Sequence, residues 1–156
     1  MDRRPVPHGA EPRLIFSGLA GFYDQAIGLS WPLIRIAVGI NLVIHGWGKI
    51  GRTAGPAQLL DKLPEAAQIG MQLTFLLMVT EFIGGACLAL GLLTRVFAAM
   101  AAIEMAVLTF YIYWGNGFGW LSRGYEYTLM WGLVLFAVAL RGGGPWSLDR
   151  WLRREI

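Results

Sequence analysis

The sequence predicts an all-α integral membrane protein: a bundle of four transmembrane helices with an N-terminal interfacial segment and a short C-terminal amphipathic helix. Hydrophobic residues make up 56% of the 156 residues and charged residues only 15%, with a mean hydropathy of +0.53. These values lie outside the range of ordinary soluble domains. The apolar residues also form four runs close to the ~20 residues that cross a hydrocarbon core. A chain of this length allows one such domain.

The residues before the first long apolar run are expected to form two segments. Residues 1–13 hold three arginines and three prolines, which predicts a disordered basic tail. Residues 14–29 mix large apolar residues with Ser, Asp and Gln, so they are predicted to lie at the membrane interface rather than to span it. Ser30 is placed to cap the first span. No cleavable signal peptide is apparent, and this span would serve as the insertion signal.

A transmembrane domain is expected over residues 30–141, followed by an interfacial helix over residues 142–156. The latter segment opens with Gly-Gly-Gly-Pro and continues with an amphipathic run that Ser147 can cap. The connections between spans carry Gly, Pro and aromatic residues, which are typical of loops. The expected spans are about 30–49, 71–93, 96–114 and 125–141.

The distribution of basic residues predicts the orientation in the membrane. If both termini share one side, that side carries eight Lys and Arg residues and the opposite side four. Basic residues favour the cytoplasmic side, so we expect a multi-pass protein of the cell inner (cytoplasmic) membrane with both termini in the cytoplasm. Because these charges lie at span ends rather than in one patch, the expected partner is the lipid bilayer and not a nucleic acid.

Glu81 is the residue around which the bundle is expected to form. It lies near the middle of the second span, where a bare carboxylate costs at least ~2.5 kcal/mol. It should therefore be paired, protonated or in contact with a wet cavity. Gly84 and Gly85 lie on the same helix face one turn further on, and small residues allow another helix to approach closely. We therefore expect Glu81 to point into the bundle.

Other ionisable residues in the spans complete a candidate site. By their depth at 1.5 Å per residue, Arg35 is expected to lie closest to Glu104, and His45 and Lys49 near Glu81 or Glu126. Basic donors aimed at carbonyl oxygens, with carboxylates to pass protons, suit a quinone head group. The predicted catalytic residues are Glu81, Glu104 and Arg35, and the predicted cofactor-binding residues are Arg35, His45, Lys49, Glu81 and Glu126.

Less specific interpretations of the same residues remain open. Arg35 and Glu104 could form a structural ion pair, and Lys49 and Glu126 are at span ends where charged side chains often reach the interface. Haem is a less favourable cofactor because His45 is the one histidine within the spans. Zinc ligation by His45, Glu81 and Glu126 has no recognisable spacing, so no metal site is predicted. A single cysteine excludes a dithiol within this chain.

Several motifs together resemble the DoxX family of membrane proteins. The resemblance covers residues 30–150 and implies a four-helix membrane protein. Some members of that family are associated with redox systems, as a subunit of thiosulfate:quinone oxidoreductase or in complexes linked to thiol and oxidative-stress defence. The motifs are Arg35-x-x-x-Gly39 with His45-Gly46-x-x-Lys49, then Glu81-x-x-Gly84-Gly85 with Leu90-Gly91-Leu-Leu-Thr94-Arg95, and finally Gly-Pro-Trp-Ser147-Leu-Asp149.

Three functions are compatible with these observations. The first is a membrane subunit of a sulfur- or thiol-linked oxidoreductase that interacts with quinone through the polar intramembrane site. The second is a non-enzymatic membrane anchor or assembly partner that docks a soluble redox protein through the loops at 51–70 or 115–124. The third is a small-solute or proton carrier, for which four spans are few unless the protein forms a homodimer. The sequence leaves open whether the chain is an enzyme by itself.

Overall fold

The computed structural model describes residues 14–50 and 76–153, and all regular secondary structure in these two ranges is helical. The expected tail over 1–13, the loop over 51–70 and the first residues of the expected second span lie outside the described residues. Two helical segments are long and apolar enough to cross a membrane, Ser17–Lys49 and Thr94–Asn116. A shorter apolar helix covers Leu76–Leu90.

The first helix, α1, covers Ala20–Lys49 and is longer than the expected span. A 3-10 turn, η1 (Ser17–Leu19), precedes it. The expectation that Ser30 caps a helix is wrong. Ser30 is an interior residue of α1, and its hydroxyl donates to the carbonyl of Ile27 at 2.7 Å. This back-bonding inside a helix is common for serine. Helical structure therefore continues through residues that were expected to form a separate interfacial segment.

The remaining elements are α-helices joined to short π-helical and 3-10 turns. The apolar helix Leu76–Leu90 contains a π-helical turn, η3, followed by α4, and the segment Thr94–Asn116 contains a second π-helical turn, η4, after α5. An ordered loop with two 3-10 turns leads to α6, and a short helix ends the described chain. The bounds are η3 Val79–Ile83, α4 Gly84–Leu90, α5 Thr94–Val107, η4 Leu108–Tyr113, η5 Trp114–Asn116, η6 Trp120–Ser122, α6 Glu126–Arg141 and α7 Leu148–Trp151.

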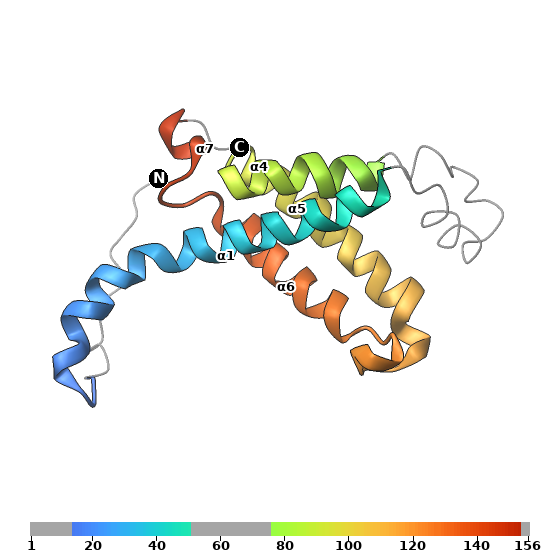
Figure 1. Ribbon diagram of the computed structural model, residues 1–156, viewed down its shortest axis with the longest axis horizontal. Helices are drawn as coiled ribbons and strands as arrows, with labels where there is room; N and C mark the ends of the chain where they lie inside the picture. The colour runs from blue at the N-terminus through green and yellow to red at the C-terminus, as the bar shows by residue number, and fades with distance from the viewer. Residues whose placement is uncertain (1–13, 51–75, 154–156) are drawn as a thin grey trace.

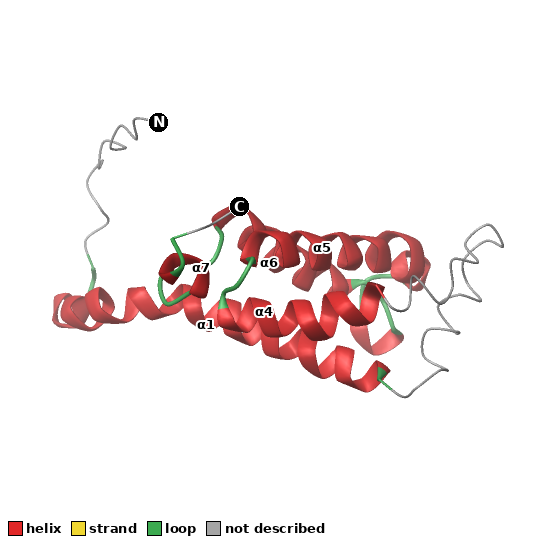
Figure 2. Ribbon diagram, turned by 90° about the horizontal axis from the view of Figure 1, so that it is seen from above, coloured by secondary structure: helices red, strands yellow, loops and turns green. Residues whose placement is uncertain are grey.

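The helices pack as two pairs. α1 lies against η3 and α4, and α5 lies against α6, while α4 and α5 join the pairs through their tight connection. Figures 1 and 2 show these two layers, with the first turns of α1 extending beyond the other helices. Buried apolar residues from all four helices fill the space between the layers: Trp31, Val38, Leu42, Leu88, Ala98, Ala101, Met105, Leu135 and Val138.

Glycines set the close crossing of α1 and α4. A Cβ atom added to Gly39 would lie 2.5 Å from the backbone nitrogen of Ala89, and one added to Gly85 would lie 2.8 Å from the Gly39 carbonyl oxygen. Such contacts leave no room for a side chain, so the two backbones touch. This confirms that Gly85 packs against another backbone. Gly84 instead faces the ring of Phe97 on α5, 2.8 Å from an added Cβ.

The C-terminal segment folds back over the connection between α4 and α5. The Asp149 carboxylate accepts hydrogen bonds from the backbone N–H groups of Leu93 (2.7 Å) and Thr94 (2.9 Å), at the start of α5. Its own N–H donates to the Gly91 carbonyl at 2.8 Å. Ser147 caps α7 as expected, accepting from the N–H of Arg150. We call Gly142–Trp151 the C-terminal clasp, because it closes this end of the molecule.

The outer faces of the helices are strongly apolar. Ile44, Ile103 and Leu133 are 65%, 66% and 62% exposed, although they lie on three different helices. An apolar surface of this extent on several sides is unfavourable in water but is what a lipid bilayer requires.

Candidate functional site

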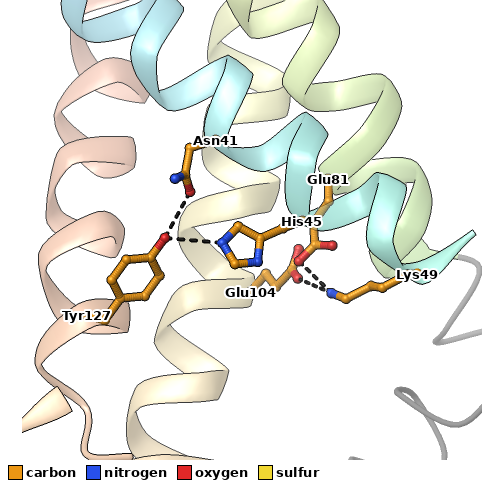
Figure 3. Close-up of polar contacts among 6 residues, drawn as sticks. All are labelled: Asn41, His45, Lys49, Glu81, Glu104 and Tyr127. Carbon is orange, nitrogen blue, oxygen red and sulfur yellow. Dashed lines mark hydrogen bonds and ion pairs between the residues drawn. The ribbon is translucent and has the colours of Figure 1, made fainter. Parts of the chain in front are cut away.

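Glu81 lies on the π-helical turn η3 and faces the interior, as the sequence predicts. Its side chain is 4% exposed, and its Oε1 atom lies 2.5 Å from Nζ of Lys49 on α1 (Figure 3). π-helical turns insert an extra residue into a helix and often mark functional positions. Gly46, one turn before Lys49, allows this approach because an added Cβ would lie 2.6 Å from the backbone nitrogen of Phe82.

Glu104 on α5 completes an acid–lysine cluster with Lys49 and Glu81. Nζ of Lys49 lies 3.9 Å from Oε1 of Glu104, whose side chain is 5% exposed. Among the residues that the structure describes, no N–H group donates to either oxygen of Glu104 or to Oε2 of Glu81, and the two carboxyl groups lie beside each other. One ammonium group thus faces two buried carboxyl groups. Buried polar groups without partners are rare in folded proteins and mark positions where a ligand, an ion or water would be stabilised.

A second group of polar side chains connects α1 with α6. The hydroxyl of Tyr127 donates to Oδ1 of Asn41 at 3.0 Å, and Nε2 of His45 lies 3.2 Å from the same hydroxyl (Figure 3). Which of the two groups donates in the contact between His45 and Tyr127 depends on the tautomer of the imidazole. The ring of Tyr127 also contacts Trp131, with centroids 6.0 Å apart. Nε1 of Trp131 is buried and has no partner within the described ranges.

The expected contact between Arg35 and Glu104 is wrong. Arg35 is buried near the middle of α1, beside the C-terminal clasp, where its guanidinium donates to the carbonyls of Leu88 (2.8 Å), Ala89 (3.1 Å) and Trp146 (2.9 Å). The last carbonyls of a helix have no partner within the helix. Arg35 satisfies those of α4 and ties them to the C-terminal clasp. Its role in a site with Glu81 stays a prediction without a contact to support it.

Glu126 also lies apart from the cluster. Its Oε2 atom accepts a hydrogen bond from the backbone N–H of Trp120 at 3.1 Å, which ties the start of α6 to the loop before it. The six sequence-predicted residues thus divide in the structure. Lys49, Glu81 and Glu104 come together, and His45 lies near them on α1, but Arg35 and Glu126 make backbone contacts elsewhere.

No three His, Cys, Asp or Glu side chains in residues 14–50 and 76–153 converge closely enough to hold a metal ion. The combination of His45, Glu81 and Glu126 considered for zinc is therefore not assembled there.

Asn41 and Tyr127 belong to the site but were not among the predicted site residues. Asn41 shares the polar stripe of α1 with His45 and Lys49, so its position on that stripe was a usable signal. Tyr127 had no such signal, because a tyrosine near the start of a membrane helix usually lies at the interface. Thr109 and Thr128 were also missed, and their buried hydroxyls form a 2.8 Å hydrogen bond between η4 and α6.

Comparisons with known proteins place this chain in a family. The DoxX family model matches residues 30–114. The inner membrane protein YqjF of Escherichia coli is 32% identical over 124 residues, covering 78% of this chain and 90% of that protein. An uncharacterized protein of Haemophilus influenzae is 29% identical over 124 residues, covering 74% and 85%. No solved structure matches significantly. From the extent of the family match, the chain belongs to the DoxX family of membrane proteins.

Proposed function

We propose that this protein is the membrane subunit of a sulfur- or thiol-linked oxidoreductase system and that its acid–lysine cluster interacts with a quinone head group. The observation that carries this proposal is Glu104: its carboxyl is buried, accepts no hydrogen bond from an N–H group of the described chain, and lies beside the Glu81 carboxyl and the ammonium that contacts it. A buried carboxyl that accepts no hydrogen bond is unfavourable unless it holds a proton or meets a ligand.

The cluster has the chemistry that a quinone head group requires. A quinone supplies two carbonyl oxygens that accept protons when the ring takes up electrons. The ammonium of Lys49 can donate to one carbonyl and balance charge that develops on it. Since one ammonium neutralises only one carboxylate, the pair of Glu81 and Glu104 holds a proton that can move to a bound oxygen. Nε1 of Trp131 is a further buried donor without a partner in the described residues.

We place the protein in the inner membrane with four spans and both termini in the cytoplasm. Helix α6 covers ~24 Å at 1.5 Å per residue, and Tyr and Trp residues beside it extend that length to the interface. Exposed basic residues at the clasp end, including Arg141 and Arg150, support a cytoplasmic position for that end. The inner-membrane assignment is supported by the similarity to the Escherichia coli protein, which is named as an inner membrane protein.

A second candidate function is a membrane anchor or assembly partner for a soluble redox protein. The ordered loop between η4 and α6 favours it, because Trp120 and Leu121 are 63% and 86% exposed there. Stacking between Trp114 and Tyr125, with centroids 4.6 Å apart, fixes the shape of this loop. A homodimer of this chain would present two such loops to the soluble protein.

Quinone binding to the purified protein tests the primary proposal. A short-chain benzoquinone should raise the unfolding temperature of the wild-type protein in lipid nanodiscs, because a ligand that binds only the folded state stabilises it. The shift should disappear in Glu104→Gln. The matched control is Glu126→Gln, which makes the same chemical change outside the cluster and should keep the shift. Absence of a shift in the wild-type protein, or an equal shift in Glu104→Gln, would reject quinone binding at this cluster.

A further inference from the structure

His45 is a polar residue on an otherwise lipid-facing surface. It is exposed, and so is Ile44, the preceding residue on α1. On α6, Met130 and Leu133 are 54% and 62% exposed and continue the apolar surface. A histidine that faces acyl chains is unfavourable, and polar residues inside a membrane generally line a path for a substrate or proton. Besides its contact with Tyr127, the exposed imidazole of His45 can therefore bind a polar group of a ligand dissolved in the bilayer.

The hydrogen-bonded chain Asn41–Tyr127–His45 lies where α1 meets α6 (Figure 3). α1 packs mainly against η3 and α4, and α6 packs mainly against α5, so this seam is not a main packing interface of the bundle. An incoming carbonyl oxygen can replace Asn41 as the acceptor of the Tyr127 proton, because a phenolic hydroxyl carries one donor. A packed apolar seam between two helices would lack that property.

Side-chain contacts continue from this seam to α5, the helix that carries Glu104. Trp131 lies one helical turn beyond Tyr127, contacts its ring, and has a buried Nε1 without a partner among the described residues. The next residue, Gly132, packs against Met105, since an added Cβ would lie 3.2 Å from the Met105 Cβ atom. Met105 follows Glu104 on α5. Packing contacts through Trp131, Gly132 and Met105 thus connect the seam to α5, the helix that carries the buried carboxyl of Glu104.

We propose that a quinone enters the site sideways from the bilayer, between α1 and α6, and that Tyr127 and His45 receive one carbonyl of its ring. This inference rests on the proposed function and adds the route and the residues that select the ligand. The ligand class is a lipid-soluble quinone with an apolar tail. The tail stays in the bilayer along the exposed side chains of Ile44 and Leu133, while the head group replaces bonds within the Asn41–Tyr127–His45 chain and reaches the acid–lysine cluster.

A photoreactive azido-benzoquinone, carrying the azide on the ring, tests the route on the wild-type protein in nanodiscs. We expect cross-links, mapped by mass spectrometry, within residues 41–45 or 127–131. Tyr127→Phe should weaken quinone binding about tenfold, which corresponds to the loss of ~1.4 kcal/mol. The matched control is Tyr111→Phe, because Tyr111 is 80% exposed on η4 and lies outside this seam.

The outcomes separate the two proposals. Cross-links confined to other helices, or equal affinity in Tyr127→Phe and the wild type, would overturn lateral entry at this seam while leaving quinone binding intact. Failure of the wild-type protein to bind quinone at all would overturn the proposed function and this inference together. Saturable labelling at the seam that is lost in Tyr127→Phe but kept in Tyr111→Phe supports entry between α1 and α6.

Discussion

At the residue scale, Lys49 determines the charge balance of the interior. Its Nζ atom lies 2.5 Å from Oε1 of Glu81 and 3.9 Å from Oε1 of Glu104, the two buried acids of the acid–lysine cluster. Its side chain is 30% exposed, so it also reaches the surface at the end of α1. The sequence placed Lys49 near Glu81 or Glu126, with extension outward to the interface as the alternative for a charged residue at a span end. The side chain extends inward, because two carboxyl groups are within the reach of its flexible stem.

Removing the charge of Lys49 should destabilise the protein. Removing one acid in addition should restore most of the lost stability. Lys49→Met leaves two buried acids without a cation and should lower the free energy of unfolding by on the order of 2–3 kcal/mol. Adding Glu81→Gln to that variant should recover most of the loss, since the remaining acid can be protonated. Unfolding followed by circular dichroism in micelles measures both effects. Equal stability of Lys49→Met and the control Arg123→Met, which changes an exposed loop residue, would contradict this charge balance.

At the element scale, the crossing of α1 over α4 depends on glycine. Gly39→Leu should reduce the free energy of unfolding by on the order of 3 kcal/mol, because its side chain would meet the backbone of Ala89. Gly48→Leu is the matched control on the same helix, where nothing lies within 4 Å of an added Cβ. The two variants should differ clearly in unfolding temperature. If Gly39→Leu were as stable as Gly48→Leu, the close backbone contact would be wrong.

The C-terminal clasp is the second element whose contribution can be measured. Asp149→Ala removes the acceptors for two backbone N–H groups at the start of α5 and should cost on the order of 2 kcal/mol. Protease cleavage after residue 142 should then become faster. Asp24→Ala, at an exposed position of α1, should leave both stability and cleavage unchanged. Unaltered cleavage in Asp149→Ala would show that the clasp is held by other contacts.

The helices were predictable from the sequence to different extents. Apolar runs located the helical segments, because composition and length reflect the requirements of a bilayer. Helix ends were less predictable: α1 begins at Ala20, where the sequence is amphipathic but still compatible with helix. The π-helical turns η3 and η4 left no signal in the hydrophobic pattern. They rotate the residues after them, and this rotation shifts which side chains meet.

The candidate site was partly predictable from the positions of its charged residues in the apolar runs. The sequence identified Glu81 as inward-facing and brought Lys49 into its neighbourhood, since intramembrane charges must be compensated. It paired Arg35 with Glu104 because depths were counted along straight helices from assumed ends. The carbonyls of α4 and of Trp146 compete for that guanidinium, and such backbone acceptors are not visible in a side-chain pattern. The contacts of Tyr127 could not be predicted without knowing that α6 lies beside α1.

At the scale of the whole molecule, the orientation in the membrane can be tested with engineered cysteines. The single native cysteine, Cys87, is replaced by alanine, and Ser122→Cys or Arg150→Cys is introduced at an exposed position. A membrane-impermeant maleimide applied to intact spheroplasts should label Ser122→Cys and not Arg150→Cys. Permeabilised cells should show labelling of both. The reverse pattern in intact spheroplasts would place the termini outside the cytoplasm.

The whole account depends on buried carboxyl groups that respond to a ligand in the bundle interior. Infrared difference spectroscopy on the nanodisc protein, recorded as bound quinone is reduced, measures this response directly. We predict a change in a protonated carboxyl band that is absent in Glu104→Gln and kept in Glu126→Gln. A difference spectrum without any carboxyl change, or with the same change in Glu104→Gln, would contradict a role for the acid–lysine cluster.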